Sequence, residues 1–284
     1  MTALTLLLHP AQTLALDDWT IHPSTVIGLT ALGWLYFRRA RAGGGIGPST
    51  AQRIGFVSGL VLLFLILNGP LHDLSDFYLF SGHMVQHLIM ELIVPPLLIA
   101  GTPGWMLRPA LQWPVIGTIA RRISTPVMAF AIFNVTLSVW HIPALYNLAL
   151  LHHNVHILQH VTFLVASVLM WWPFMSPLPE LPRLSYPGQM LYCFLMTLPM
   201  SVVAIYIAMA DTVLYPLYAS SPRLWGISPK MDQLIGGLIM WIPGGLFFYG
   251  VMTVVFFRWQ RQGNGGDSAA DAQGAHGTLL PAPR

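Results

Sequence analysis

Long apolar stretches alternate with short polar ones along most of the chain, and this pattern predicts a bundle of membrane-spanning helices. A helix crosses the apolar core of a bilayer with about 20 residues. Seven stretches come near that length, at residues 24–37, 54–71, 77–100, 126–140, 153–175, 189–209 and 234–257. The first stretch is short, and we expect it to extend outward through residues 19–23.

Composition narrows the class of protein. The 284 residues are 55% hydrophobic and only 8% charged, whereas about 25% of residues are charged in a soluble domain. We therefore expect an all-α, polytopic membrane helix bundle with an extracytoplasmic segment at 1–23 and a seven-helix domain at 24–257. The tail at 258–284 is rich in Gly, Ala, Gln and Asp, a composition typical of disorder.

Basic residues predict the orientation of the bundle, because cytoplasmic loops of membrane proteins carry an excess of Lys and Arg. Seven spans place the two termini on opposite sides of the membrane. Only Arg223 and Lys230 fall on one side. The other eleven basic residues share the opposite side: Arg38, Arg39, Arg41, Arg53, Arg108, Arg121, Arg122, Arg183, Arg258, Arg261 and Arg284. The sequence therefore predicts an N-terminus outside and a C-terminus in the cytoplasm.

A polar stripe interrupts the third apolar stretch near its outer end. His83, His87 and Glu91 follow one another at four-residue spacing, so a helix places them along one face. Two imidazoles one turn apart can chelate a metal ion. Ionisable groups are costly inside a bilayer and tend to face a partner or a cavity, which makes the stripe a candidate functional site.

Further polar residues fall at the same predicted depth. His156 and His160 repeat the four-residue spacing at the start of the fifth stretch. His141 ends the fourth stretch and Asp232 precedes the seventh. The predicted topology puts ten of the eleven histidines outside and only His276 inside. Imidazole is a ligand for copper, zinc, iron and nickel, and the single cysteine excludes a Cys-x-x-Cys metal site.

Each of these groups also has a structural interpretation. An interfacial imidazole can be solvated or can bond to a backbone carbonyl. This interpretation is favoured for four histidines: His9, His22, His72 and His276. Glu91 can be a buried structural partner, or it can pass a proton or an ion inward. Asp232 can cap the seventh helix as an acidic residue in its first turn.

Six segments between the second and the seventh stretch resemble those of a known protein family. They comprise residues 81–87 (SGHMVQH), 95–97, 101–103, 140–146 (WHIPALY), the His pair before Trp171-Trp172-Pro173, and Asp232-Gln233 with Gly236-Gly237 and Trp241. Together they resemble the CtaG-type cytochrome c oxidase assembly factors, seven-helix membrane proteins of bacteria. They do not resemble the single-span, cysteine-based copper chaperone that sometimes shares the name.

The resemblance implies a non-enzymatic role in building the haem–copper oxidase, through delivery of copper to its catalytic subunit. It implies metal-handling roles for His83, His87, His141, His156, His160 and Asp232. The expected surroundings are the bacterial inner membrane, with its lipid bilayer, the oxidase subunit and a periplasmic copper chaperone as partners. Nucleic acid is not an expected partner.

Three alternatives stay open at this point. A haem-binding or haem-modifying protein needs one axial histidine from each of two helices, such as His87 and His160. A metal-dependent membrane hydrolase needs a general base, for which Glu91 or Asp232 would have to serve. A metal transporter would use Glu91 to continue the polar stripe inward. Zinc is the alternative ion to copper at the histidines.

Overall fold

The computed structural model describes residues 19–43 and 47–276, with side chains described as far as residue 262. All elements in these ranges are helices. The first half holds α2 (Pro23–Ala42), α3 (Thr50–Asn68), α4 (Pro70–Asp73), the π-helix η1 (Leu74–Tyr78), α5 (Phe80–Leu88), the π-helix η2 (Ile89–Ile93), α6 (Val94–Gly101), α7 (Gly104–Leu111) and α8 (Pro114–Ile123). The second half holds α9 (Pro126–Trp140), α10 (Pro143–Leu151), α11 (His153–Met175), α12 (Tyr186–Met209), α13 (Pro216–Ser220) and α14 (Pro229–His276).

Proline marks where many of these helices begin. It stands in the first turn of α2, α4, α8, α9, α10 and α13. A first-turn N–H has no partner within the helix, so proline costs nothing at that position, and its fixed φ suits the helix. The prolines that punctuate the sequence therefore set the boundaries of the helices.

Five helical segments are long and apolar enough to cross a membrane. They are α3, the continuous segment Phe80–Gly101 made of α5, η2 and α6, then α11, α12 and Pro229–Gln262 of α14. The helices α8 and α9 meet at 78° and add a sixth only if the bent pair is one span. The α2 helix has 20 residues but is not among them, and its last turn carries Arg39 and Arg41. Seven spans and the orientation of the termini stay predictions.

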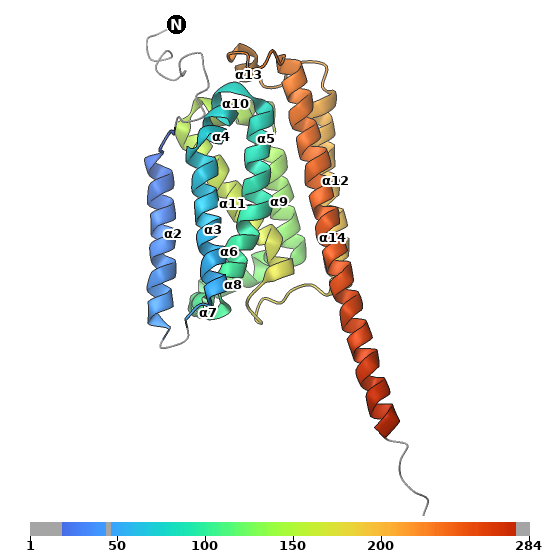
Figure 1. Cartoon of the computed structure of the whole chain (residues 1–284). Coiled ribbons are helices and arrows are strands. Elements are labelled where there is room, and N and C mark those ends of the chain that lie inside the picture. The colour runs from blue at the N-terminus through green and yellow to red at the C-terminus, as the bar shows by residue number, and fades with distance from the viewer. Residues whose placement is uncertain (1–18, 44–46, 277–284) are drawn as a thin grey trace, which may run out of the picture.

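The segment Phe80–Gly101 forms the centre of the bundle. In the most apolar 18-residue window of this segment, 61% is buried inside the protein, compared with 22–44% in the corresponding windows of the other four segments. Figure 1 shows it between α3 and α9, with α12 and α14 on the far side. The α2 helix lies outside α3, along the same height of the bundle (Figure 1), and the Tyr36 hydroxyl donates to the Gly101 carbonyl at 3.0 Å.

The π-helix η2 has an identifiable cause in the sequence. Pro95 has no N–H, so the carbonyl of Glu91, four residues earlier, loses its α-helical donor. The indole Nε1 of Trp171 on α11 donates to that carbonyl instead, at 3.0 Å. The backbone widens here, and the N–H of Val94 donates to the carbonyl of Ile89, five residues back. Pro95 thus widens the helix next to the polar stripe.

The last helix, α14, packs closely because it carries adjacent glycines. A Cβ at Gly236 would lie 2.3 Å from Cδ1 of Phe80, and a Cβ at Gly237 would lie 2.9 Å from Cβ of Ala208. These two positions let α14 approach α5 and α12. The helix continues to His276, and the disorder that composition favours in the tail stays a prediction. A helix gains one hydrogen bond for each residue it adds, and no proline interrupts this sequence before Pro281.

Candidate metal centre

Side chains from several helices meet at one end of the bundle. The starts of α5 and α11, together with α4, α10 and α13, lie at this end, while α7 and α8 lie at the other (Figure 1). The arginines of α7 and α8, namely Arg108, Arg121 and Arg122, are therefore remote from this end. This separation of imidazole from guanidinium groups matches the division that the sequence predicts between the outer and the inner side.

The stripe on the central helix is a compact group. The rings of His83 and His87 stack with centroids 4.3 Å apart. Nδ1 of His87 lies 3.2 Å from Oε1 of Glu91. All three residues are buried, with His83 fully excluded from the surface. One helical face thus presents two imidazoles and a carboxylate to the interior.

The pair on α11 faces this stripe. The rings of His156 and His160 are 4.3 Å apart. Across the two helices, His83 lies 6.2 Å from His156 and 6.4 Å from His160, measured between ring centroids, and His87 lies 5.3 Å from His160. Four imidazoles from two helices therefore occupy one place in the bundle.

Asp76 on η1 adds a carboxylate to the four imidazoles. Its Oδ2 lies 3.2 Å from Nδ1 of His156 and 3.4 Å from Nε2 of His72. One ligand atom from each of Asp76, His83 and His156 lies within 4.8 Å of the other two. A metal held about 2.1 Å from each atom needs ligand atoms at most about 4.2 Å apart. A small side-chain rotation would bring these three atoms into that range.

The hydrogen bonds of Gln86 fix the proton of His72. Nε2 of Gln86 is 2.5 Å from the carbonyl of Ile66, which can only accept, so this atom must be the amide nitrogen. The same nitrogen lies 3.0 Å from Nδ1 of His72, which must then accept. Nε2 of His72 consequently carries the proton and donates to Asp76. Burial lowers the pKa of His72, so the ring is neutral and oriented by its neighbours.

Several imidazoles present an unused ring nitrogen to the interior. Among the residues that the structure describes, the following buried atoms have no hydrogen-bond partner: both nitrogens of His83 and Nε2 of His87, His141, His156 and His160. Burying a polar group without a partner costs free energy, and such groups are rare in proteins. Neutral imidazole nitrogens with free lone pairs are ligands for copper and zinc. The donor set therefore fits such an ion.

The second nitrogen of three of these rings is already in use. Nδ1 of His87 faces Glu91, Nδ1 of His156 faces Asp76, and Nδ1 of His141 donates to the carbonyl of Leu137 at 2.7 Å. Metal-binding histidines commonly donate one N–H to a carboxylate or a carbonyl, which orients the other nitrogen toward the ion. All three rings show this arrangement.

A comparison with protein families identifies the family of this chain. The model of the family described as cytochrome c oxidase caa3 assembly factor matches residues 31–262. The chain belongs to this family. The match includes every residue of the buried cluster, from His72 to His160, and also Asp232, and it confirms the resemblance seen in the sequence.

Three curated proteins that are similar to this chain are longer mycobacterial proteins. Uncharacterized proteins of Mycobacterium bovis and Mycobacterium tuberculosis are each 26% identical over 201 residues, which cover 65% of this chain and 30% of the relative. One of Mycobacterium leprae is 24% identical over 260 residues, covering 84% of this chain and 39% of the relative. The chain thus spans about a third of the length of these relatives. No solved structure matches it.

The structure brings five of the six sequence-predicted site residues of this chain together and places the sixth elsewhere. The cluster includes His83, His87, His156 and His160, and His141 lies at its edge, 6.2 Å from the ring of Phe163, which contacts His87. Asp232 is engaged elsewhere. Its carboxylate accepts from the N–H of Phe80 at 2.7 Å and from the N–H and hydroxyl of Ser81 at 3.1 and 2.5 Å.

The bonds of Asp232 make it a cap for α5, a role that neither sequence interpretation of the residue includes. It lies in the first turn of α14, yet it satisfies the unpaired N–H groups that begin the neighbouring helix. These hydrogen bonds engage both oxygens of the carboxylate. Sequence spacing could not reveal this role, because the capped residues lie about 150 positions earlier in the chain.

Three residues of the cluster escaped the sequence prediction. His72 was interpreted as a solvated interfacial histidine, but it is buried at 5% exposure and bonded on both nitrogens. Asp76 and Gln86 were not singled out. The four-residue spacing of His72 and Asp76 was the available signal. This spacing alone does not predict a buried site, because only the tertiary structure shows that η1 points into the bundle. His9 lies outside the described residues.

Proposed function

We propose that this assembly factor binds a copper ion among His83, His87, His156, His160 and Asp76, and hands it to the catalytic subunit of a haem–copper oxidase. The observation that carries the proposal is the group of ligand atoms from Asp76, His83 and His156 within 4.8 Å of one another. The unused nitrogens around them add further donors. His141 supplies a donor at the edge of the set.

The chemistry of the donors favours an ion as the cargo. Neutral imidazoles suit copper and zinc, and copper is one of the metals of the haem–copper oxidase that the family resemblance implies. The Asp76 carboxylate supplies negative charge that offsets the charge of a cation. The membrane then serves as the medium of transfer, because both the donor and the acceptor protein are embedded in it.

The size of the adjoining space disfavours haem. The pocket that reaches His156 and His160 has a volume of about 30 Å³, far below the range of about 300–1,000 Å³ that is typical of small-molecule pockets. The cluster itself is filled by rings 4.3–6.4 Å apart. We therefore place the role of this chain in ion handling, without catalysis, in the bacterial inner membrane.

Copper binding by purified variants tests the proposal. The chain is loaded with Cu(I) without oxygen, freed of excess metal, and its copper-to-protein ratio is measured for wild type and for His83→Ala, His87→Ala, His156→Ala and His160→Ala. We expect each variant to retain less copper than wild type. The control is His152→Ala, because His152 is exposed and makes no side-chain cap bond. Oxidase copper content in cells that carry each variant should follow the same order.

Three results would contradict the proposal. An unchanged copper ratio in all four variants would remove the site. A Soret absorption band in protein purified from its native membrane would instead favour the haem-binding alternative. Copper accumulation inside sealed vesicles would show transport across the membrane in place of hand-over within it.

A further inference from the structure

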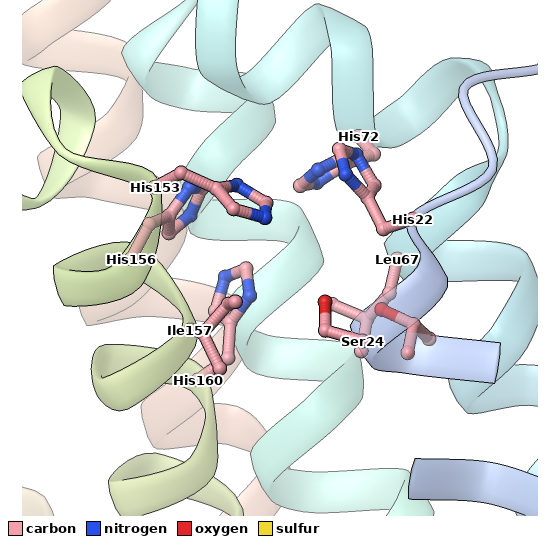
Figure 2. A pocket seen from close by; sticks show the side chains of 9 residues that line it. His22, Ser24, Leu67, His72, His153, His156, Ile157 and His160 are labelled. Carbon is pink, nitrogen blue, oxygen red and sulfur yellow. The ribbon is translucent and has the colours of Figure 1, made fainter. Parts of the chain in front are cut away.

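A pocket connects the buried cluster with the surface. His22 at the N-cap of α2 and His153 at the first turn of α11 line its two sides. His72, His156 and His160 line its inner part. Figure 2 shows His153 and His156 on one side and His22 and His72 on the other, with their rings turned toward the space between them. The pocket is therefore lined by imidazoles from its rim to the cluster.

These rings form a continuous series. The rings of His22 and His153 stack with centroids 5.4 Å apart, and His22 lies 4.7 Å from His72. From His72 the next rings are His156 at 5.7 Å and His160 at 6.1 Å. His160 then contacts His87 at 5.3 Å. His72 is bonded on both nitrogens, so the rings that can bind an ion along the pocket are His22, His153, His156 and His160.

Exposure distinguishes the rim from the interior. His153 is exposed and His22 is half-buried, whereas His72 and His156 are buried. Nε2 of His22 is buried and has no hydrogen-bond partner among the described residues. The segment around His22 is held in place, since its N–H donates to Oδ1 of Asn68 at 2.8 Å. The rim is thus an ordered part of the pocket.

Aromatic side chains close the other side of the cluster. Tyr146 covers His83 with a ring 5.1 Å away and packs against Tyr215 at 4.2 Å. Phe80 stacks on Tyr215 at 4.7 Å, and the hydroxyls of Tyr146 and Tyr218 are 3.0 Å apart. All four aromatic residues are at most 2% exposed. A cation that approaches His83 from this side would have to displace a sealed aromatic layer.

A cation that enters a dry site must replace its water by protein ligands, because burying a bare charge is very costly. The imidazoles of His22 and His153 at the rim supply the first protein ligands that replace this water. We propose that His22 and His153 form a loading pair, which takes up Cu(I) at the surface and passes it to His156 and His160 in the inner part of the same pocket. The loading pair rests on the proposed copper site and adds the route by which that site is filled.

Loading kinetics test the route. Purified protein in lipid nanodiscs is mixed, without oxygen, with Cu(I) held by a chromophoric chelator, and the transfer of copper is followed by absorbance. We expect His22→Gln/His153→Gln to reach the same final copper ratio as wild type, but about tenfold or more slowly, because the first ligand exchange has a higher barrier. His152→Gln is the matched control and should load at the wild-type rate, since His152 does not line the pocket.

A rescue variant distinguishes a ligand from a structural part. Thioether sulfur binds Cu(I), so His153→Met should load faster than His153→Gln. His153 is exposed, so neither single variant is expected to affect folding. Equal rates for wild type and the double variant would overturn the loading pair. A lower final ratio in the double variant would also overturn it, because the two rings would then belong to the storage site. If wild type itself takes no copper, the proposed function fails first.

Discussion

Gln86 decides how the ligands of the candidate site are oriented, although it is not a candidate ligand. Its amide bonds the Ile66 carbonyl and Nδ1 of His72, and its Oε1 accepts from the Ser75 hydroxyl at 3.0 Å. These contacts set the His72 proton that faces Asp76. The neutral side chain of Gln86 thus sets which proton faces the Asp76 carboxylate, and it does so through the ring of His72.

We expect Gln86→Leu to weaken Cu(I) binding about 10–100-fold, the range for groups that orient metal ligands. Without the amide, His72 can move its proton to Nδ1 and stop donating to Asp76. Equilibrium competition against a chromophoric Cu(I) chelator measures the affinity. Gln189→Leu is the control, because Gln189 is also buried and donates to a backbone carbonyl, that of Leu184. Wild-type affinity in Gln86→Leu would contradict the role assigned to this residue.

At the scale of elements, α5 is flanked by two π-helices that each carry a carboxylate. Asp76 lies in η1 and faces His72 and His156, and Glu91 lies in η2 and faces His87. Single π-turns within helices frequently occur at functional sites, because they displace side chains from α-helical register. The proline that causes η2 could be identified in the sequence, but the direction in which the carboxylates turn could not.

The cap on α5 gives a prediction for Asp232. We expect Asp232→Ala to lower the free energy of unfolding by about 1–3 kcal/mol for each buried donor that loses its partner. The copper ratio of the folded fraction should equal that of wild type. Thermal unfolding and metal analysis of the same sample measure both quantities. A variant that keeps its stability but loses copper would make Asp232 a ligand after all.

The close approach of α14 to α5 gives a second prediction at this scale. We expect Gly236→Ala to destabilise the protein by about 1–3 kcal/mol, as overpacked cores do, because the new methyl would meet the ring of Phe80. Gly245→Ala on the same helix is the control. A Cβ there meets nothing within 4 Å, and alanine gains up to about 1 kcal/mol of helix propensity over glycine. Equal unfolding midpoints for the two variants would contradict this packing.

At the scale of the whole molecule, the seven-span topology can be tested by labelling. The native Cys193 is buried at 1% exposure, so newly introduced cysteines should dominate the signal. We expect a membrane-impermeant maleimide to label Ile21→Cys and His152→Cys in cells whose outer surface is accessible. It should label Arg41→Cys only after the membrane is permeabilised. All three parent residues are exposed. Opposite results for Ile21→Cys and His152→Cys would show that α2 does not span the membrane.

The sequence by itself determined the helical class, the apolar segments and the four-residue spacing of His83/His87 and His156/His160, because these are properties of neighbouring residues on one helix. Only the tertiary structure decided that the two pairs face each other, that Asp76 joins them and that Asp232 caps α5. Those contacts join segments far apart in the chain. Their geometry depends on how helices pack and where π-turns widen them, which local periodicity does not specify.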